Sequence, residues 1–126
     1  MAKILVAEDE MDIRELIRLT LEFSGHEVNT ARDGLEAVDI VSQDNSFDLI
    51  LMDVRMPRMT GYEACRQLKQ KASTKHIPVV FLSAKGQEAE VETGLALGAA
   101  DYILKPFAPD FLIKEIGKIL AEKVRN

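Results

Sequence analysis

The chain has 126 residues and a mass of 14.1 kDa, and its 47% hydrophobic content is enough to build one globular domain spanning residues 1–126. Its net charge of −5 argues against direct contact with nucleic acid, because phosphate backbones are bound by basic surfaces. No apolar run approaches a membrane span and no signal peptide precedes Lys3, which predicts a cytoplasmic protein without membrane contact. The single Cys65 permits no internal disulfide, in agreement with a reducing compartment.

Strand-like and helix-like segments alternate five times, without a linker or repeat between them. The strands are expected where short apolar runs end in polar residues. They are Lys3 to Ala7, Glu27 to Ala31, Asp48 to Asp53, Pro78 to Ser83 and Asp101 to Leu104.

The first three helices have recognisable boundaries. The first ends at Gly25 and carries apolar or small residues at helical spacing, namely Ile13, Leu16, Ile17, Thr20 and Leu21. The second opens at Asp33-Gly34 and is expected to turn three residues inward, Leu35, Val38 and Val41. Thr60 and Glu63 have the spacing of a capping box, which predicts that the third helix begins there.

The last two helices differ in strength. The fourth, about Gln87 to Leu97, is weak because it contains Gly94 and few large apolar residues, and it stops at Gly98. The fifth begins near Pro109, which suits a first helical position. Its inward residues are expected to be Leu112, Ile116, Ile119 and Leu120.

Strands that alternate with helices predict an α/β fold in which a parallel sheet is covered on both faces. The natural arrangement for five such units is the flavodoxin-like (βα)5 three-layer sandwich, with strand order 2-1-3-4-5. The first and third strands are then neighbours at the switch point, so the carboxylates of Glu8, Asp9 and Asp53 should converge at the carboxyl edge of the sheet.

Three converging carboxylates would raise one another's pKa unless a cation lay among them. An acidic all-oxygen site of this kind suits Mg²⁺, which uses one or two carboxylates together with phosphate oxygens. The Asp53 carboxylate is then placed to attack a phosphoryl group, while Lys105 supplies a positive charge and Ser83 a hydroxyl donor. The sequence therefore predicts a site for a divalent cation and a phosphoryl group.

Over essentially its whole length, the chain resembles a CheY-like receiver domain of a two-component response regulator. The resemblance rests on five motifs in a specific order and spacing. They are Glu8-Asp9, the segment Asp53-Val54-Arg55-Met56-Pro57, Gly61, Ser83-Ala84 and the segment Tyr102-Ile103-Leu104-Lys105-Pro106-Phe107.

The resemblance implies that Asp53 is the phosphoacceptor. Asp9, Asp53 and the backbone carbonyl of Arg55 would bind Mg²⁺, and Glu8 would act mostly through a metal-bound water. Lys105 would pair with a phosphoryl oxygen, and the backbone N–H groups of Val54 and Ala84 would donate to others. Lys105-Pro106 matches a position where the family has a cis peptide. Ser83 and Tyr102 match the hydroxyl and aromatic switch residues.

A receiver domain of this family is not a classical enzyme, since it catalyses only its own phosphorylation and dephosphorylation. Its partners would be a sensor histidine kinase or phosphotransfer protein and an output domain or partner protein. The output surface is expected on the fourth helix, fifth strand and fifth helix, including Lys85, Glu90, Tyr102 and Lys114. Arg55 and Lys85 match variable positions that tune the lifetime of the phosphoryl group.

Four alternatives stay open at this stage. A haloacid dehalogenase-type phosphatase would need a second Asp where Arg55 stands. A flavin or nucleotide module would need a phosphate-binding loop in place of Glu8-Asp9-Glu10. The third is a degenerate receiver that serves only for docking. A phosphorylation-dependent homodimer is the fourth. It is put in doubt because Ala99-Ala100-Asp101 keeps one acidic residue where the dimerising subfamily usually has two, and because the last helix reads Ile116-Gly117-Lys118-Ile119-Leu120-Ala121-Glu122-Lys123 where that subfamily usually has an arginine-rich dimer face.

Overall fold

The structure is a computed structural model that describes the backbone of residues 1–84 and 88–125 and the side chains of residues 1–84 and 92–122. Within this part of the chain, strands and helices alternate as the sequence predicts. The strands are β1 (Lys3–Ala7), β2 (Glu27–Ala31), β3 (Leu49–Asp53), β4 (Val79–Ala84) and β5 (Asp101–Lys105). The helices are α1 (Met11–Phe23), α2 (Gly34–Gln43), α3 (Gly61–Gln70), α4 (Glu88–Ala96) and α5 (Pro109–Arg125). The predicted starting residue Gln87 of α4 lies outside the described residues, as does Lys85.

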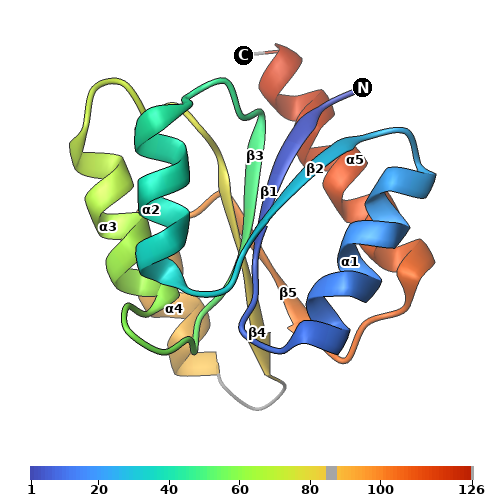
Figure 1. Cartoon of the computed structure of the whole chain (residues 1–126), viewed down its shortest axis with the longest axis horizontal. Coiled ribbons are helices and arrows are strands. Elements are labelled where there is room, and N and C mark those ends of the chain that lie inside the picture. The colour runs from blue at the N-terminus through green and yellow to red at the C-terminus, as the bar shows by residue number, and fades with distance from the viewer. Residues whose placement is uncertain (85–87, 126) are drawn as a thin grey trace.

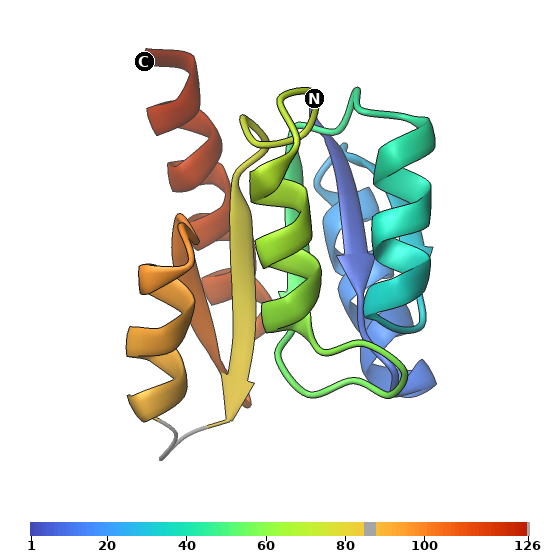
Figure 2. The ribbon, with the colours of Figure 1, turned by 90° about the vertical axis from the view of Figure 1, so that its left-hand side faces the viewer.

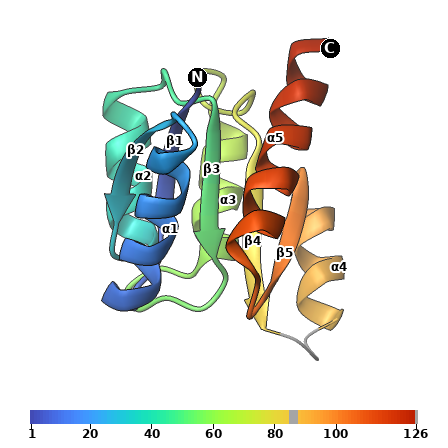
Figure 3. The ribbon, with the colours of Figure 1, turned by 90° about the vertical axis from the view of Figure 1, so that its right-hand side faces the viewer.

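The strands form one parallel sheet in the order β2-β1-β3-β4-β5, which confirms the predicted flavodoxin-like topology (Figure 1). Helices α2, α3 and α4 cover one face (Figure 2), and α1 and α5 cover the other (Figure 3). Because all five strands run the same way, their carboxyl ends lie along a single edge of the sheet. That edge is where the predicted site residues should gather.

The sheet carries a hydrophobic core on each face. Alternate strand residues point to opposite sides, so Leu5 and Ile50 pack toward α2 and α3, whereas Ile4 and Leu51 pack toward α1 and α5. β3 is buried along its whole length, which is the burial expected of a central parallel strand. Asp53 at its end is therefore the point at which a buried strand reaches polar surroundings.

Helix caps fix where α2 and α3 begin. The Asp33 side chain accepts the Glu36 N–H at 2.9 Å, and the Thr60 hydroxyl accepts the Glu63 N–H at 3.2 Å. In a complete capping box the Glu63 carboxylate would also accept the Thr60 N–H. Here it pairs with Arg66 instead. Both helices thus start next to the loop that follows β3.

Two predicted core positions were wrong. Leu35 is 37% exposed because the inward face of α2 consists of Gly34, Ala37, Val38 and Val41, and Leu35 lies one residue away from it. Leu16 is 50% exposed because α1 turns Ile17 and Leu21 toward the sheet. Among the residues described, no helix has the length and apolar character needed to cross a membrane.

Candidate functional site

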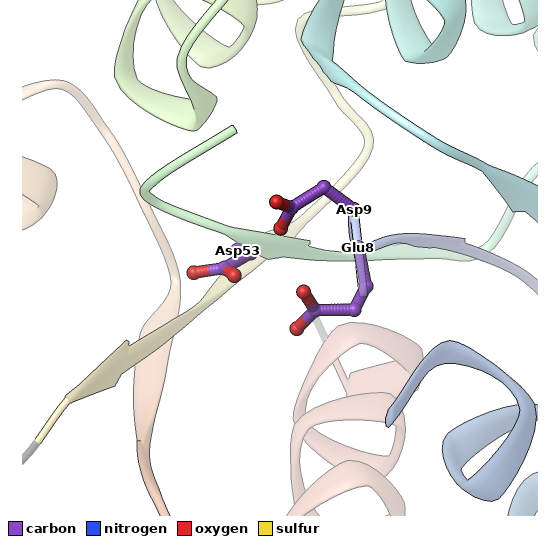
Figure 4. Close-up of side chains that lie close together, drawn as sticks. All are labelled: Glu8, Asp9 and Asp53. Atoms are coloured by element: carbon purple, nitrogen blue, oxygen red, sulfur yellow. The ribbon is translucent and has the colours of Figure 1, made fainter. Parts of the chain in front are cut away.

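Three carboxylates meet at the carboxyl edge of the sheet. Glu8 and Asp9 follow β1, and Asp53 ends β3, the strand paired with β1. One carboxylate oxygen of each residue lies within 4.8 Å of one from each of the others, and Figure 4 shows the three side chains gathered in one space. The structure thus brings these predicted residues together. We call them, with Lys105, the acidic edge.

Glu8 is the most deeply buried member of the acidic edge. Its residue is 0% exposed, its N–H donates to the Ala31 carbonyl at 3.1 Å, and its carboxylate accepts the Glu10 N–H at 3.2 Å. Burial, followed by the charge of Asp53, raises the pKa of Glu8 to about 8. The site therefore lacks enough positive charge to keep the Glu8 carboxylate ionised at neutral pH.

Asp53 is almost as buried, at 5% exposed, and its carboxylate accepts from the Lys105 ammonium and the Arg55 N–H. Lys105 Nζ lies 3.0 Å from its Oδ2 and 3.4 Å from Glu8 Oε1, so one ammonium bridges the two acids. Burial alone would lower the pKa of Lys105, but the hydrogen bond and charge of Asp53, with the charge of Glu8, raise it overall. Lys105 therefore stays protonated beside the carboxylate.

A hollow of about 160 Å³ opens over Asp53. Its walls combine acids, cations and a hydroxyl, from Asp9, Glu10, Asp53, Arg55, Ser83, Ala84 and Lys105. The donor set is entirely oxygen and the cluster is short of positive charge, so these residues fit a hard divalent cation such as Mg²⁺. The same hollow is lined by the Lys105 cation and the Ser83 hydroxyl, the two kinds of group that phosphoryl binding requires.

Ser83 and Tyr102 share a second, much narrower space on the α4 side of the sheet. Ser83 is 2% exposed and Tyr102 is half-buried, and both line this space together with Phe81 and Leu95. The Phe81 ring packs edge-on against Tyr62, with centroids 5.4 Å apart. The two predicted switch residues thus border a common space.

The structure also shows contacts that the sequence did not predict. Arg14 on α1 donates from Nη1 to the Glu8 carbonyl at 2.9 Å and so supports the loop that carries the acidic pair. The Arg55 N–H donates to Asp53 Oδ1 at 3.3 Å, whereas the N–H of Val54 donates to the Leu82 carbonyl at 3.2 Å. The Arg14 and Arg55 contacts have no sequence signal, since both depend on where a loop turns. The peptide bond before Pro106 is cis, as the resemblance implies.

Comparison with known proteins agrees with this geometry. Residues 4–117 match the family described as the response regulator receiver domain. The chain is 42% identical to the probable transcriptional regulator ycf27 of Cyanophora paradoxa and 41% identical to the phosphate regulon transcriptional regulatory protein PhoB of Rhizobium meliloti. Each match covers 94% of this chain, but only 48% and 52% of those relatives, so the chain spans about half their length.

Solved structures share this fold. The chemotaxis response regulator CheY4 of Vibrio cholerae superimposes with a TM-score of 0.88 at 36% identity, covering 94% of this chain and 98% of that one. This chain belongs to the response regulator receiver domain family of two-component signalling. Receiver domains of this family are phosphoacceptors rather than classical enzymes, they bind Mg²⁺ in an acidic pocket, and response regulators act with histidine kinases and output domains.

Proposed function

We propose that Asp53 accepts a phosphoryl group from a histidine kinase or phosphotransfer protein, in a reaction that requires Mg²⁺. The observation that supports this most is the Asp53 carboxylate itself, which is buried, held by Lys105 at 3.0 Å, and open to a hollow that it shares with Asp9. An ordinary strand-end aspartate that caps a turn would face solvent and would not need a half-buried ammonium beside it.

In the proposed reaction a carboxylate oxygen of Asp53 attacks the phosphorus of a phosphohistidine. A P–O bond forms, the P–N bond breaks, and its electron pair returns to the donor imidazole. Lys105 balances the charge that the phosphoryl oxygens bring to Asp53, and the Ser83 hydroxyl donates to one of them. The backbone N–H of Ala84, which also lines the hollow, serves as a further donor.

The donor predicted at Val54 requires a rearrangement. Its N–H is paired with the Leu82 carbonyl, so it would have to leave that partner in order to bind a phosphoryl oxygen. The N–H of Arg55 is already directed at the Asp53 carboxylate, and we assign it the role of an additional donor. Both groups belong to the first turn of the loop after β3.

Glu8, Asp9, Asp53 and the Arg55 carbonyl would hold the Mg²⁺. When bound, the ion would neutralise the carboxylates and stabilise charge on the transferring phosphoryl oxygens. The Glu8 carboxylate already accepts the Glu10 N–H. We therefore assign it a role through a metal-bound water rather than as a direct ligand. Asp9 is the exposed member of the three carboxylates and lines the hollow.

We propose that phosphorylation is read out on the face formed by α4, β5 and α5, which includes Tyr102 and Lys114. A phosphoryl group adds about −1.5 to −2 charge. Drawing Ser83 toward it would enlarge the space that Ser83 and Tyr102 share, into which Tyr102 can turn. The predicted members Lys85 and Glu90 lie outside the described side chains. This face would bind an output domain or partner protein without direct contact to nucleic acid, or a second copy of the chain.

The whole chain, residues 1–126, would act as one receiver unit in the cytoplasm. The test is intact mass after incubation with acetyl phosphate, with Mg²⁺ and with a chelator, on the wild type and on Asp53→Asn. One added phosphate that needs both Mg²⁺ and Asp53 is the expected result. If Mg²⁺ binds but no adduct forms and beryllofluoride does not bind, the chain would be a docking domain and the proposal would fail.

A further inference from the structure

The loop between β3 and α3, residues 54–60, carries the Arg55 backbone groups that the proposed function uses. Its base is closed by the Gly61 N–H, which donates to the Val54 carbonyl at 2.9 Å. A Cβ on Gly61 would lie 2.2 Å from the Asp53 carbonyl oxygen, so the two ends of the loop touch. The far side of the loop runs beside the first turn of α2 (Figure 2).

Two neighbouring residues at the start of α2 hold this far side. The Gly34 N–H donates to the Met59 carbonyl at 3.1 Å, and a Cβ on Gly34 would lie 2.3 Å from that oxygen. Asp33 is 5% exposed and divides its carboxylate between two partners. Oδ1 accepts the Glu36 N–H at 2.9 Å as the helix cap, and Oδ2 accepts Arg58 Nε at 2.8 Å.

The backbone of Arg58 indicates that this pair is more than a surface ion pair. Arg58 has a φ of 64°, the left-handed region that glycine occupies far more readily than a residue with a Cβ. A position that favours glycine nevertheless holds an arginine, whose guanidinium forms an ion pair with the buried carboxylate of Asp33. The residue with the strained backbone is thus also the one whose side chain ties the loop to the start of α2.

We propose that the Asp33–Arg58 ion pair positions the loop of residues 54–60 so that the Arg55 carbonyl faces the Mg²⁺ site. This role rests on the proposed function, because it acts on the metal site assigned there. Asp33 and Arg58 are positioning residues that do not line the hollow over Asp53. Partners outside the first coordination shell commonly change metal affinity by tenfold or more.

The decisive variant is Arg58→Gly, assayed for Mg²⁺ affinity by calorimetry on the unphosphorylated chain. Glycine adopts the left-handed backbone at position 58 without steric strain, so the fold should be retained while the Asp33–Arg58 ion pair is lost. Removing a cation near an acidic site would by electrostatics alone tighten Mg²⁺ binding. If the ion pair positions the loop, Arg58→Gly should instead bind Mg²⁺ about tenfold more weakly than the wild type. Unchanged or tighter binding would overturn the proposal.

Two matched variants sharpen the test. Arg66→Gln removes a cation that pairs with Glu63 within α3, and its Mg²⁺ affinity should stay within about twofold of the wild type. Asp33→Asn keeps the helix cap, since asparagine caps as well as aspartate, but loses the charged partner of Arg58. The double variant of Asp33→Asn and Arg58→Gly should bind Mg²⁺ no more weakly than the weaker single variant. Additive losses would overturn the pairing.

Amide exchange in metal-free buffer gives a readout independent of Mg²⁺. The Arg55 N–H should exchange faster in Arg58→Gly than in the wild type, and equal rates would contradict the proposal. The two hypotheses fail separately. If the wild type binds Mg²⁺ and is phosphorylated while Arg58→Gly behaves identically, only the positioning role falls. If the wild type itself binds no Mg²⁺, the proposed function falls.

Discussion

The acidic edge and the α4 side of the sheet are built differently. Beside the acidic edge, α2 and α3 begin at side-chain caps, and α3 buries a continuous face of Gly61, Ala64, Cys65 and Leu68. Among the described α4 side chains, residues 92–96, only Gly94 is buried. The proposed chemistry, which depends on fixed distances, thus lies beside the tightly packed helices. The proposed output face includes α4, whose described side chains are mostly exposed.

The largest effect should come from Gly61→Ala, which tests the tightly packed half. The new Cβ would lie 2.2 Å from the Asp53 carbonyl oxygen, and a backbone atom of a central strand cannot move aside. We expect a loss of about 3 kcal/mol in the free energy of unfolding, together with weaker Mg²⁺ binding. Urea denaturation measures the first and calorimetry the second. A loss below about 1 kcal/mol would show that the loop after β3 is more tolerant than the structure implies.

The second prediction concerns the raised pKa of Glu8, about 8 instead of 4.5. The folded chain then holds a proton that the unfolded chain has released, so stability should fall as pH rises between these two values. Without Mg²⁺ the free energy of unfolding should drop by on the order of 2 kcal/mol between about pH 5 and pH 7. Urea denaturation at several pH values measures this.

Glu8→Gln is the control for that measurement, because it removes the titrating group and should flatten the slope. Saturating Mg²⁺ should flatten it as well, since the cation favours the ionised carboxylate. A steep fall that persists in Glu8→Gln would assign the pH dependence to another group.

The third prediction uses a glycine with free space around it. Gly117 lies in α5 with no atom within 4 Å of the position a Cβ would take. Gly117→Ala should therefore stabilise the chain by about 1 kcal/mol through helix propensity alone. Thermal unfolding gives the shift. Destabilisation would mean that α5 is contacted at this point in a way the structure does not show.

The smallest effect is expected for Gly94→Ala on the α4 side. Its Cβ would lie 2.7 Å from a ring carbon of Phe81, so α4 or the ring must shift. The gain in helix propensity, about 1 kcal/mol, should offset a shift of similar cost and leave stability within about 0.5 kcal/mol of the wild type. A loss as large as that of Gly61→Ala in the same urea assay would break the contrast between the two regions.

The sequence predicted the sheet and the convergence of its site residues because both follow from regular patterns. Apolar runs of strand length alternated with helical spacing, and parallel strands place the polar residues after them at one edge. Asp53, Glu8 and Lys105 therefore met as expected. The pKa of Glu8 is raised, but burial contributes more to this rise than the neighbouring charge of Asp53 on which the sequence argument relied.

The contacts made by loops could not be predicted in this way. The Arg58 pairing with Asp33 depends on a left-handed residue, and nothing in Met56-Pro57-Arg58 distinguishes that turn from others. Leu35 shows the same limit on a helix, since an apolar residue beside an inward glycine can face solvent. Geometry within a turn or around a helix axis is set by packing rather than by residue type.

The measurement that tests the account most directly is amide exchange with and without beryllofluoride and Mg²⁺, a mimic of the phosphorylated state, on the wild type and on Asp53→Asn. We predict changed exchange in α4 and β5, with α2 and the buried part of α3 unaltered, and no change at all in Asp53→Asn. Equal exchange in α4 and β5 with and without the mimic, in a chain that binds it at Asp53, would contradict the account.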